Sequence, residues 1–231
     1  MKPPSISAIP VLLSVTAGYV DTAGYLALQG LFTAHVTGNF VTLGASLVSG
    51  TSGVLAKVLA LPTFCIVIIV TRWASYGLPP QGLPILRTML SLKVLLLATA
   101  AALAIHFGPF RNGNTGAALA TGLTLVSAMA IQNAAQRIHL GASPPTTVMT
   151  GTTTQIMIDL ADLMRGLSKD KKDAAHARLV RMSVAVLAFA SGCAAAAMFY
   201  SLAGVYCFLA PPVLGASTLL FRMAALEGDI R

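Results

Sequence analysis

Long apolar runs with almost no charge constrain this chain most, because about 20 such residues form a helix that crosses the roughly 30 Å of hydrocarbon in a bilayer. Charged residues make up only 10% of the sequence and the mean hydropathy is +0.80, far from the balance of soluble domains. We therefore predict an all-α polytopic membrane protein with a single membrane domain over residues 1–231. The predicted full spans are residues 9–28, 54–74, 88–107, 115–138, 182–200 and 205–221.

The net charge of +8 is concentrated in one part of the chain. Six of the lysines and arginines lie between Arg165 and Arg181, which is typical of a cytoplasmic loop in a membrane protein. We therefore expect a basic cytoplasmic loop at residues 166–178 and no nucleic-acid partner. The apolar run at residues 9–28 is too long for a signal peptide and carries Asp21 in its centre.

A degenerate internal repeat divides the chain into two similar halves. The matching segments are residues 33–42 and 146–155, together with residues 18–23 and 130–135 upstream of them. The match places a Thr-Gly pair at the same point of each half, and it places Asp21 at the position of Asn133. The predicted repeats are residues 8–112 and 113–223.

Each copy of the repeat predicts a break in the helical pattern. An apolar helix is followed by about ten residues without helical periodicity, and then by a short helix that begins at Thr-Gly. The first short helix, at residues 38–49, reaches across only about half of the hydrocarbon, and the second, at residues 151–165, carries polar residues that are costly against lipid. We predict six full spans plus two broken or re-entrant half-helix segments in an inverted internal repeat. Eight full spans are the alternative.

The distribution of positive charge favours six spans over eight. With six spans, most lysines and arginines collect on one side of the membrane, which the positive-inside rule assigns to the cytoplasm. Both termini then lie in the cytoplasm. The Pro- and Gly-rich residues 77–84 predict a tight turn outside the membrane.

An extended segment leading into a half-helix predicts a helix N-terminus near the middle of the membrane. Its free N–H groups and partial positive charge favour an anion or the negative end of a dipole. Two such ends, one from each half, would form the midplane site expected of transporters with discontinuous helices. The predicted substrate-binding residues are Thr37, Gly38, Asn39, Thr150, Gly151 and Thr152. The alternative role of the Thr-Gly pairs is helix packing, which small residues often serve in membranes.

Four further polar residues are candidates for ion coupling: Asp21, His35, Asn133 and Asp159. A carboxylate in hydrocarbon costs about 2.5 to 3.5 kcal/mol on insertion scales, so Asp21 must be paired, protonated or facing water. It either couples protons or forms a structural hydrogen bond to the other half, with Asn133 as the pseudo-symmetric partner. His35 is either a proton relay or a satisfied interior residue. Asp159 is favoured over Asp162, for which an interfacial salt bridge is sufficient.

Patterns typical of a metal centre, a disulfide framework or a catalytic site do not occur in the sequence. The three cysteines fall in apolar runs without partner spacing. The zinc-protease helix signature, the nucleophile elbow and the phosphate-binding glycine loop are missing. We therefore expect no metal, no cofactor and no enzymatic activity.

Three separated motifs give the chain a resemblance to a known family. They are residues 18–21, 35–39 and 147–152. In this order they resemble the YoaK-like family of bacterial inner-membrane proteins, whose function is unknown. The resemblance implies a multi-span protein of the bacterial inner membrane and supplies no substrate. Asn39 corresponds to Thr152, so the two predicted sites are not chemically equal.

These features together predict a small channel or secondary transporter for a small anionic or polar solute, with proton coupling as a further expectation. The expected partners are membrane lipid and the solute, and a homo-oligomer is compatible with the sequence. Two alternatives stay open. One is a non-transporting membrane scaffold or sensor, whose polar residues only hold helices together. The other is an intramembrane enzyme in which Asp21, His35 and Asp159 converge.

Overall fold

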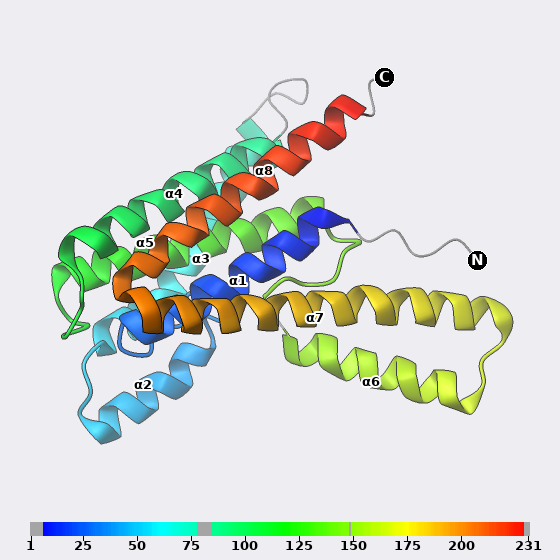
Figure 1. Cartoon of the computed structure of the whole chain (residues 1–231), viewed down its shortest axis with the longest axis horizontal. Coiled ribbons are helices and arrows are strands. Elements are labelled where there is room, and N and C mark those ends of the chain that lie inside the picture. The colour runs from blue at the N-terminus through cyan, green and yellow to red at the C-terminus, as the bar shows by residue number, and fades with distance from the viewer. Residues whose placement is uncertain (1–6, 78–84, 148, 229–231) are drawn as a thin grey trace.

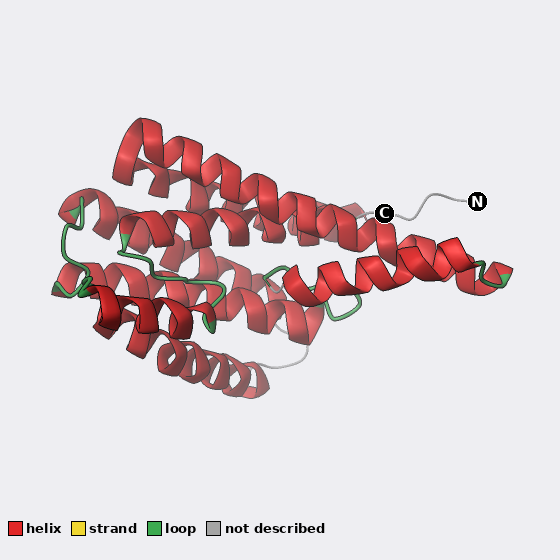
Figure 2. Ribbon diagram, turned by 90° about the horizontal axis from the view of Figure 1, so that it is seen from below, coloured by secondary structure: helices red, strands yellow, loops and turns green. Residues whose placement is uncertain are grey.

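The computed structural model describes residues 7–77, 85–147 and 149–228, with the side chains of residues 169–170 and 222–228 excepted, and the described chain is helical without strands (Figure 2). Four stretches are long and apolar enough to cross a membrane, which agrees with the predicted class: Val54–Tyr76, Ile85–Phe107, Gly116–His139 and Lys171–Phe221. Most of the turn expected at residues 77–84, and Val148 in the second Thr-Gly segment, lie outside the described residues.

The described helices follow the order expected from the apolar runs. They are α1 (Ala8–Ala27), α2 (Gly38–Ser49), α3 (Val54–Gly77), α4 (Ile85–Phe107), α5 (Gly116–His139), α6 (Met149–Arg165), α7 (Lys169–Ala203), the short 3-10 helix η1 (Gly204–Leu209) and α8 (Ala210–Gly228). The short helix predicted at residues 38–49 is α2. The last two predicted spans fall in α7 and in η1 with α8, and the chain changes direction between them at Gly204, whose φ is +56°.

The central helix is α1, because its residues are small or apolar on most of its surface. Tyr19, Val20 and Ala23 are buried, and the Tyr19 hydroxyl donates a hydrogen bond of 2.9 Å to the carbonyl of Cys207 in η1. α1 packs along α7 and also against α8. The main apolar core therefore contains residues from both halves of the sequence.

Glycines let α1 and α7 approach each other at backbone distance. A Cβ atom on Gly18 would run into the backbone carbonyl of Phe189, and one on Gly192 would run into that of Val15. Such a crossing requires the small residues that the sequence places at residues 190–197. It joins one helix of the first half to one helix of the second.

The two halves pack through corresponding pairs of helices. α3 packs against α5 as α7 packs against α1, and α4 packs against α5 as α8 packs against α1. α2 lies on α3, and α6 lies on α7. In Figure 1, α2 and α6 both begin nearer the middle of the molecule and run toward opposite ends of its long axis.

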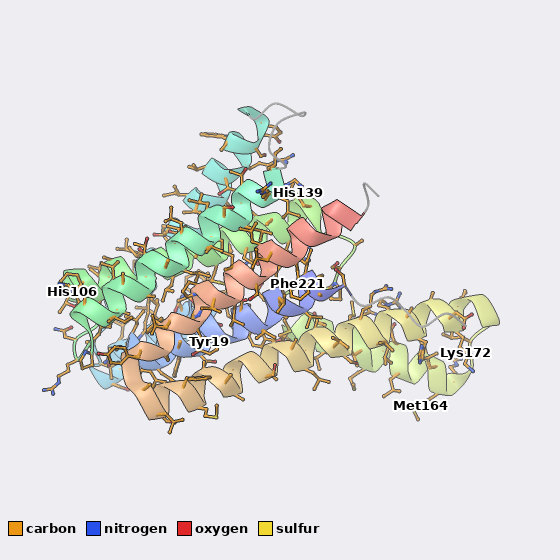
Figure 3. The ribbon with its side chains drawn as sticks, turned by 45° about the horizontal axis from the view of Figure 1, so that its top comes forward. Tyr19, His106, His139, Met164, Lys172 and Phe221 are labelled. Carbon is orange, nitrogen blue, oxygen red and sulfur yellow. The ribbon has the colours of Figure 1, made fainter. Side chains whose placement is uncertain are left out.

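The basic stretch predicted as a loop at residues 166–178 is mostly helical. α7 begins at Lys169, and only residues 166–168 connect it to α6, with a φ of +92° at Gly166. The physical reason is that lysine, arginine and alanine are good helix formers. The resulting α6–α7 hairpin projects from the bundle (Figure 1), and Met164 and Lys172 lie at its tip (Figure 3).

Candidate functional site

Asp21 closes the first break in the helical pattern by capturing backbone amides. Its Oδ1 accepts hydrogen bonds from the N–H groups of Thr33 at 2.7 Å, Ala34 at 2.8 Å and His35 at 3.4 Å. Consecutive amides that point at one position form an anion-binding concavity, and here the anion is the protein's own carboxylate. Asp21 is 4% exposed, so these bonds also offset the cost of burying its charge.

Amide side chains of α5 hold the second break. Asn133 Oδ1 accepts a hydrogen bond of 2.7 Å from the Thr147 hydroxyl. One turn later, Gln136 Nε2 donates to the carbonyls of Ser143 and Pro144, each at 3.2 Å. Asn133 therefore holds the segment after α5 with a neutral amide that accepts from a side-chain hydroxyl. Asp21 holds the segment after α1 with a carboxylate that accepts from backbone amides.

The two counterparts bond within their own halves. Asp21 binds the segment that follows α1, and Asn133 binds the segment that follows α5. The alternative expected for Asp21, a direct hydrogen bond to Asn133, is therefore wrong. The carboxylate instead fixes the path of the chain toward α2.

A pocket of about 350 Å³ lies beside the Asp21 carboxylate. α1, the segment before α2, and α7 contribute its lining, which includes Asp21, Tyr25, Phe32, His35, Phe189 and Cys193. The structure therefore brings together two of the predicted coupling residues, Asp21 and His35. His35 is exposed and its ring lies 5.7 Å from that of Phe32. Since most of the lining is aromatic or apolar, the pocket suits a small molecule that places one polar group beside the carboxylate.

The first Thr-Gly pair begins α2 but offers few free donors. The N–H groups of Gly38, Asn39 and Phe40 donate to carbonyls three residues earlier, at 2.9 to 3.2 Å. The Asn39 side chain is used as well, because its amide both donates to and accepts from the backbone of Phe32, at 2.8 and 2.9 Å. Thr37 is exposed and its side chain does not cap the helix. The free N–H groups expected at this helix start are therefore largely occupied.

The second Thr-Gly pair lies on a more open surface. Thr150 and Gly151 are exposed in the first turn of α6, and a Cβ atom on Gly151 would meet no atom within 4 Å. Thr152, by contrast, is 3% exposed. In the described part of the chain α2 and α6 do not pack against each other. The structure therefore places the first Thr-Gly pair at the start of α2 and the second inside the first turn of α6, and the two helices do not bring the pairs together.

Each short helix also carries a buried polar residue that bonds to a cation of the next helix. Ser46 in α2 accepts a hydrogen bond of 2.5 Å from Lys57 Nζ. Asp159 in α6 accepts one of 2.7 Å from Arg178 Nε and forms an ion pair with the same guanidinium. The hydrogen bonds from this guanidinium hold the pKa of Asp159 below its usual range. The interfacial salt bridge expected for Asp162 is thus formed by Asp159.

Ser46 and Asp159 occupy equivalent positions of the repeat. They are separated by the same interval in the sequence as the two Thr-Gly pairs. The same interval relates Asn39 to Thr152, and all four side chains are buried. The buried face of the short helix is therefore duplicated with changed chemistry, neutral in the first half and ionic in the second.

Lys93 in α4 is an interior lysine that the sequence did not lead us to expect. It is 0% exposed, and its Nζ has no hydrogen-bond partner among the described residues. The same is true of Ser14 Oγ and Gln132 Oε1, although Gln132 Nε2 donates to the Leu13 carbonyl at 2.9 Å. A lysine inside an apolar run was itself the available signal, because a charge at that depth is costly and is usually functional.

The helices that carry these three unpartnered atoms meet in one apolar cluster. Leu13 of α1, Leu90 of α4 and Ile131 of α5 belong to it, and they are neighbours of the three polar residues along their helices. Unpaired buried polar atoms are rare in native structures. The apolar cluster of α1, α4 and α5 is therefore a second part of the interior, besides the Asp21 pocket, where polar side chains are buried.

One family matches most of the chain. Residues 9–221 match the family described as "Protein of unknown function (DUF1275)". This agrees with the resemblance to an uncharacterised family of membrane proteins that the three motifs indicated. No curated protein and no solved structure matches the chain.

Proposed function

We propose that the chain, which belongs to this family of unknown function, is a small channel or secondary transporter for a small anionic or polar solute. The observation that carries the proposal is the paired interruption of the helical bundle. Each half has a long helix, a non-helical segment held by a polar side chain of that helix, and a short helix that begins nearer the middle of the molecule. Transporters with inverted repeats typically form their midplane binding sites from paired breaks of this kind.

An inverted repeat accounts for the packing of the two halves. Exchanging each helix of the first half for its counterpart in the second converts the α1–α7 pair into the α5–α3 pair, and the α4–α5 pair into the α8–α1 pair. In Figure 1, α1 and α5 run in opposite directions along the long axis, as α2 and α6 do. Six full spans with α2 and α6 as broken or re-entrant segments fit this arrangement, and bacterial transporters with inverted repeats bind their solute at the repeat interface.

Two interior titratable residues support the choice of solute. The Asp21 carboxylate faces a pocket that His35 also lines, which suits a proton or the positive end of a polar solute. Lys93 is a buried lysine whose Nζ has no hydrogen-bond partner in the described chain, and in its protonated form it would suit an anion. We therefore infer that an anionic or polar solute moves with a proton, and that the proton is carried at Asp21.

The proposed location is the bacterial inner membrane with both termini in the cytoplasm. The support is the basic α6–α7 hairpin, which the positive-inside rule assigns to the cytoplasmic side. The test is the reactivity of single cysteines introduced at Lys172 and at Asn112, after the native cysteines are replaced. A membrane-impermeant thiol reagent applied to intact cells should label only the position at Asn112.

The proposal of transport is tested first by ligand-induced stabilisation of the purified protein. The panel contains chloride, nitrate, formate, acetate, amino acids and sugars, each at two pH values. A ligand at 100 times its dissociation constant stabilises a protein by about 2.7 kcal/mol, which a thermal melt resolves. Compounds that shift the melt then enter flux measurements in proteoliposomes with and without a proton gradient.

Variants decide whether the shift comes from the proposed site. Asp21→Asn keeps an oxygen that can accept the three N–H bonds but removes the charge, so it should fold while losing proton-dependent flux. Thr37→Val should weaken the solute effect. Thr99→Val is the matched control, because Thr99 is exposed and its hydroxyl bonds only to its own helix at Leu95.

A non-transporting scaffold is the second candidate, and one observation favours it. The hydrogen bonds of Asp21 and Asn39 hold the backbone of the segment before α2, so polar residues here also serve the fold. A scaffold predicts that no compound shifts the melt and that Asp21→Asn and Thr37→Val lower the melting temperature directly. That pair of results would reject transport.

A further inference from the structure

A pocket lined by arginines lies where the end of α5, the segment after it and α7 meet. Its volume is about 250 Å³, and its lining includes Arg137, Arg178 and Arg181. Among the described residues, only Arg178 forms an ion pair with a carboxylate, that of Asp159. The pocket therefore carries two guanidinium groups, those of Arg137 and Arg181, that no acidic side chain of the described chain neutralises.

These two arginines mark the boundary between apolar and polar sequence. α5 has no charged residue before Arg137, and α7 has none after Arg181. Where a helix spans a bilayer, such a boundary falls at the level of the lipid headgroups. The arginine pocket therefore lies at the depth where anionic headgroups are found.

An apolar groove continues from the arginine pocket. The two cavities share part of their lining, namely Ser143, Pro144 and Arg181. The rest of the groove is formed mainly by Pro10, Val11, Val184 and Ala185. This groove is small, with a volume of about 80 Å³, and lies between the first turns of α1 and the start of the apolar part of α7. The combined site is thus positive at its polar end and apolar along its length.

We propose that this site binds one anionic phospholipid, with the phosphate between Arg137 and Arg181 and part of an acyl chain in the groove between α1 and α7. A guanidinium can donate two parallel hydrogen bonds to phosphate oxygens, and basic pockets between helices at a membrane surface bind acidic headgroups. Arginines that only orient the protein in the membrane would need neither a pocket nor a groove. The assignment does not depend on which solute the protein moves.

The lipid bridges elements whose contacts matter for the fold. Its headgroup would touch α5 and α7 and its chain would touch α1 and α7. It would therefore fasten the first turns of α1 to the helix against which they pack. Bound lipid should raise the melting temperature as well as occupy the site.

The test uses the full chain in neutral maltoside micelles. Phosphatidylglycerol and phosphatidylcholine with the same acyl chains are titrated separately, and bound lipid is counted by native mass spectrometry alongside the melt. We expect phosphatidylglycerol to bind at least tenfold more tightly than phosphatidylcholine. The Arg137→Gln/Arg181→Gln variant should lose this preference, with a loss of about fivefold for each arginine.

The control is Arg111→Gln, because Arg111 is exposed in the connection between α4 and α5 and lies outside the pocket. It should bind phosphatidylglycerol like the wild type. If the double variant folds poorly without lipid, Arg181→Lys keeps the charge without the planar fork and should weaken binding by a smaller factor.

Two results would overturn the assignment. One is unchanged phosphatidylglycerol binding in the double variant or in Arg181→Lys. The other is stabilisation by inorganic phosphate or glycerol phosphate equal to that by phosphatidylglycerol, which would make the pocket a site for a free phosphate compound and leave the groove without a role.

Discussion

Replacing Lys93 by methionine should stabilise the protein and impair its function at the same time. The side chain is fully buried in α4, and its ammonium has no hydrogen-bond partner among the described residues. Methionine keeps an unbranched chain of similar length and removes the charge. An unpaired lysine at the centre of a membrane helix costs about 2.5 to 3.5 kcal/mol. We therefore expect Lys93→Met to raise the free energy of unfolding by about 2 to 3 kcal/mol.

For a chain of this size, each kcal/mol moves the melting temperature by about 2 to 4 °C, so the shift should be about 5 to 10 °C upward. The assay is thermal unfolding in detergent with a thiol-reactive dye, because Cys207 is buried and becomes reactive only on unfolding. Cys65 is exposed and sets the constant background. The same preparation is then screened for solute-dependent stabilisation, which should be lost.

Lys57→Met is the matched control. Lys57 is also buried, at 4% exposure, but its Nζ donates to the Ser46 hydroxyl. Its removal leaves that hydroxyl without its donor and should lower stability by about 1 kcal/mol. If Lys93→Met lowers the melting temperature as Lys57→Met does, the ammonium has a stabilising partner and the reasoning from an unpaired charge is refuted.

Four further substitutions test the packing and the ion pair. Gly38→Ala should lower the melting temperature, because its methyl group would lie 2.9 Å from an aromatic ring of the preceding segment, while Gly151→Ala should leave it unchanged or raise it slightly, since the added group meets no atom. Gly18→Val should destabilise the protein by more than about 2 kcal/mol by pushing α1 off the backbone of α7, as a chemical-denaturant titration would show. Because Arg178 lowers the pKa of Asp159, this pair should stabilise the protein above the ordinary carboxyl pKa of 3.8 and lose that contribution as the pH falls below it, whereas Asp159→Asn should flatten the melting temperature against pH in that range.

The lengths of the uncharged apolar runs predicted the class of the protein, and the Thr-Gly pair predicted the bounds of α2. Both follow from local composition, because a helix that crosses a bilayer can be recognised from about 20 consecutive apolar residues. The charges of the basic segment after Gly166 predict a loop, but the segment is helical from Lys169. Charge alone does not break a helix, and lysine and arginine favour one.

The partners of the polar residues could not be predicted from the sequence. Asp21 accepts hydrogen bonds from backbone amides of a segment whose path depends on how α1 ends and α2 begins. Backbone N–H groups are the same in every residue except proline, so the sequence does not indicate which of them bind Asp21. Ser46 and Asp159 are separated by the same interval as the two Thr-Gly pairs, but a serine and an aspartate differ in chemistry. Their equivalence is recognised only in the structure, where each bonds to a cation of the next helix. Lys93 is surrounded by apolar residues in the sequence, and its complete burial became evident only in the folded chain.

The glycine contact between α1 and α7 limits how the two halves can move. At Gly18 and Gly192 the helices touch through main-chain atoms. Main-chain atoms cannot change rotamer, so the contact cannot adjust by side-chain rearrangement. Sliding along the axes would drive the flanking larger side chains into the opposite backbone. Rotation about the contact point leaves the touching atoms in place. If the halves tilt to expose a site alternately to the two sides of the membrane, this contact is the pivot, and the largest displacements fall at the far ends of both helices.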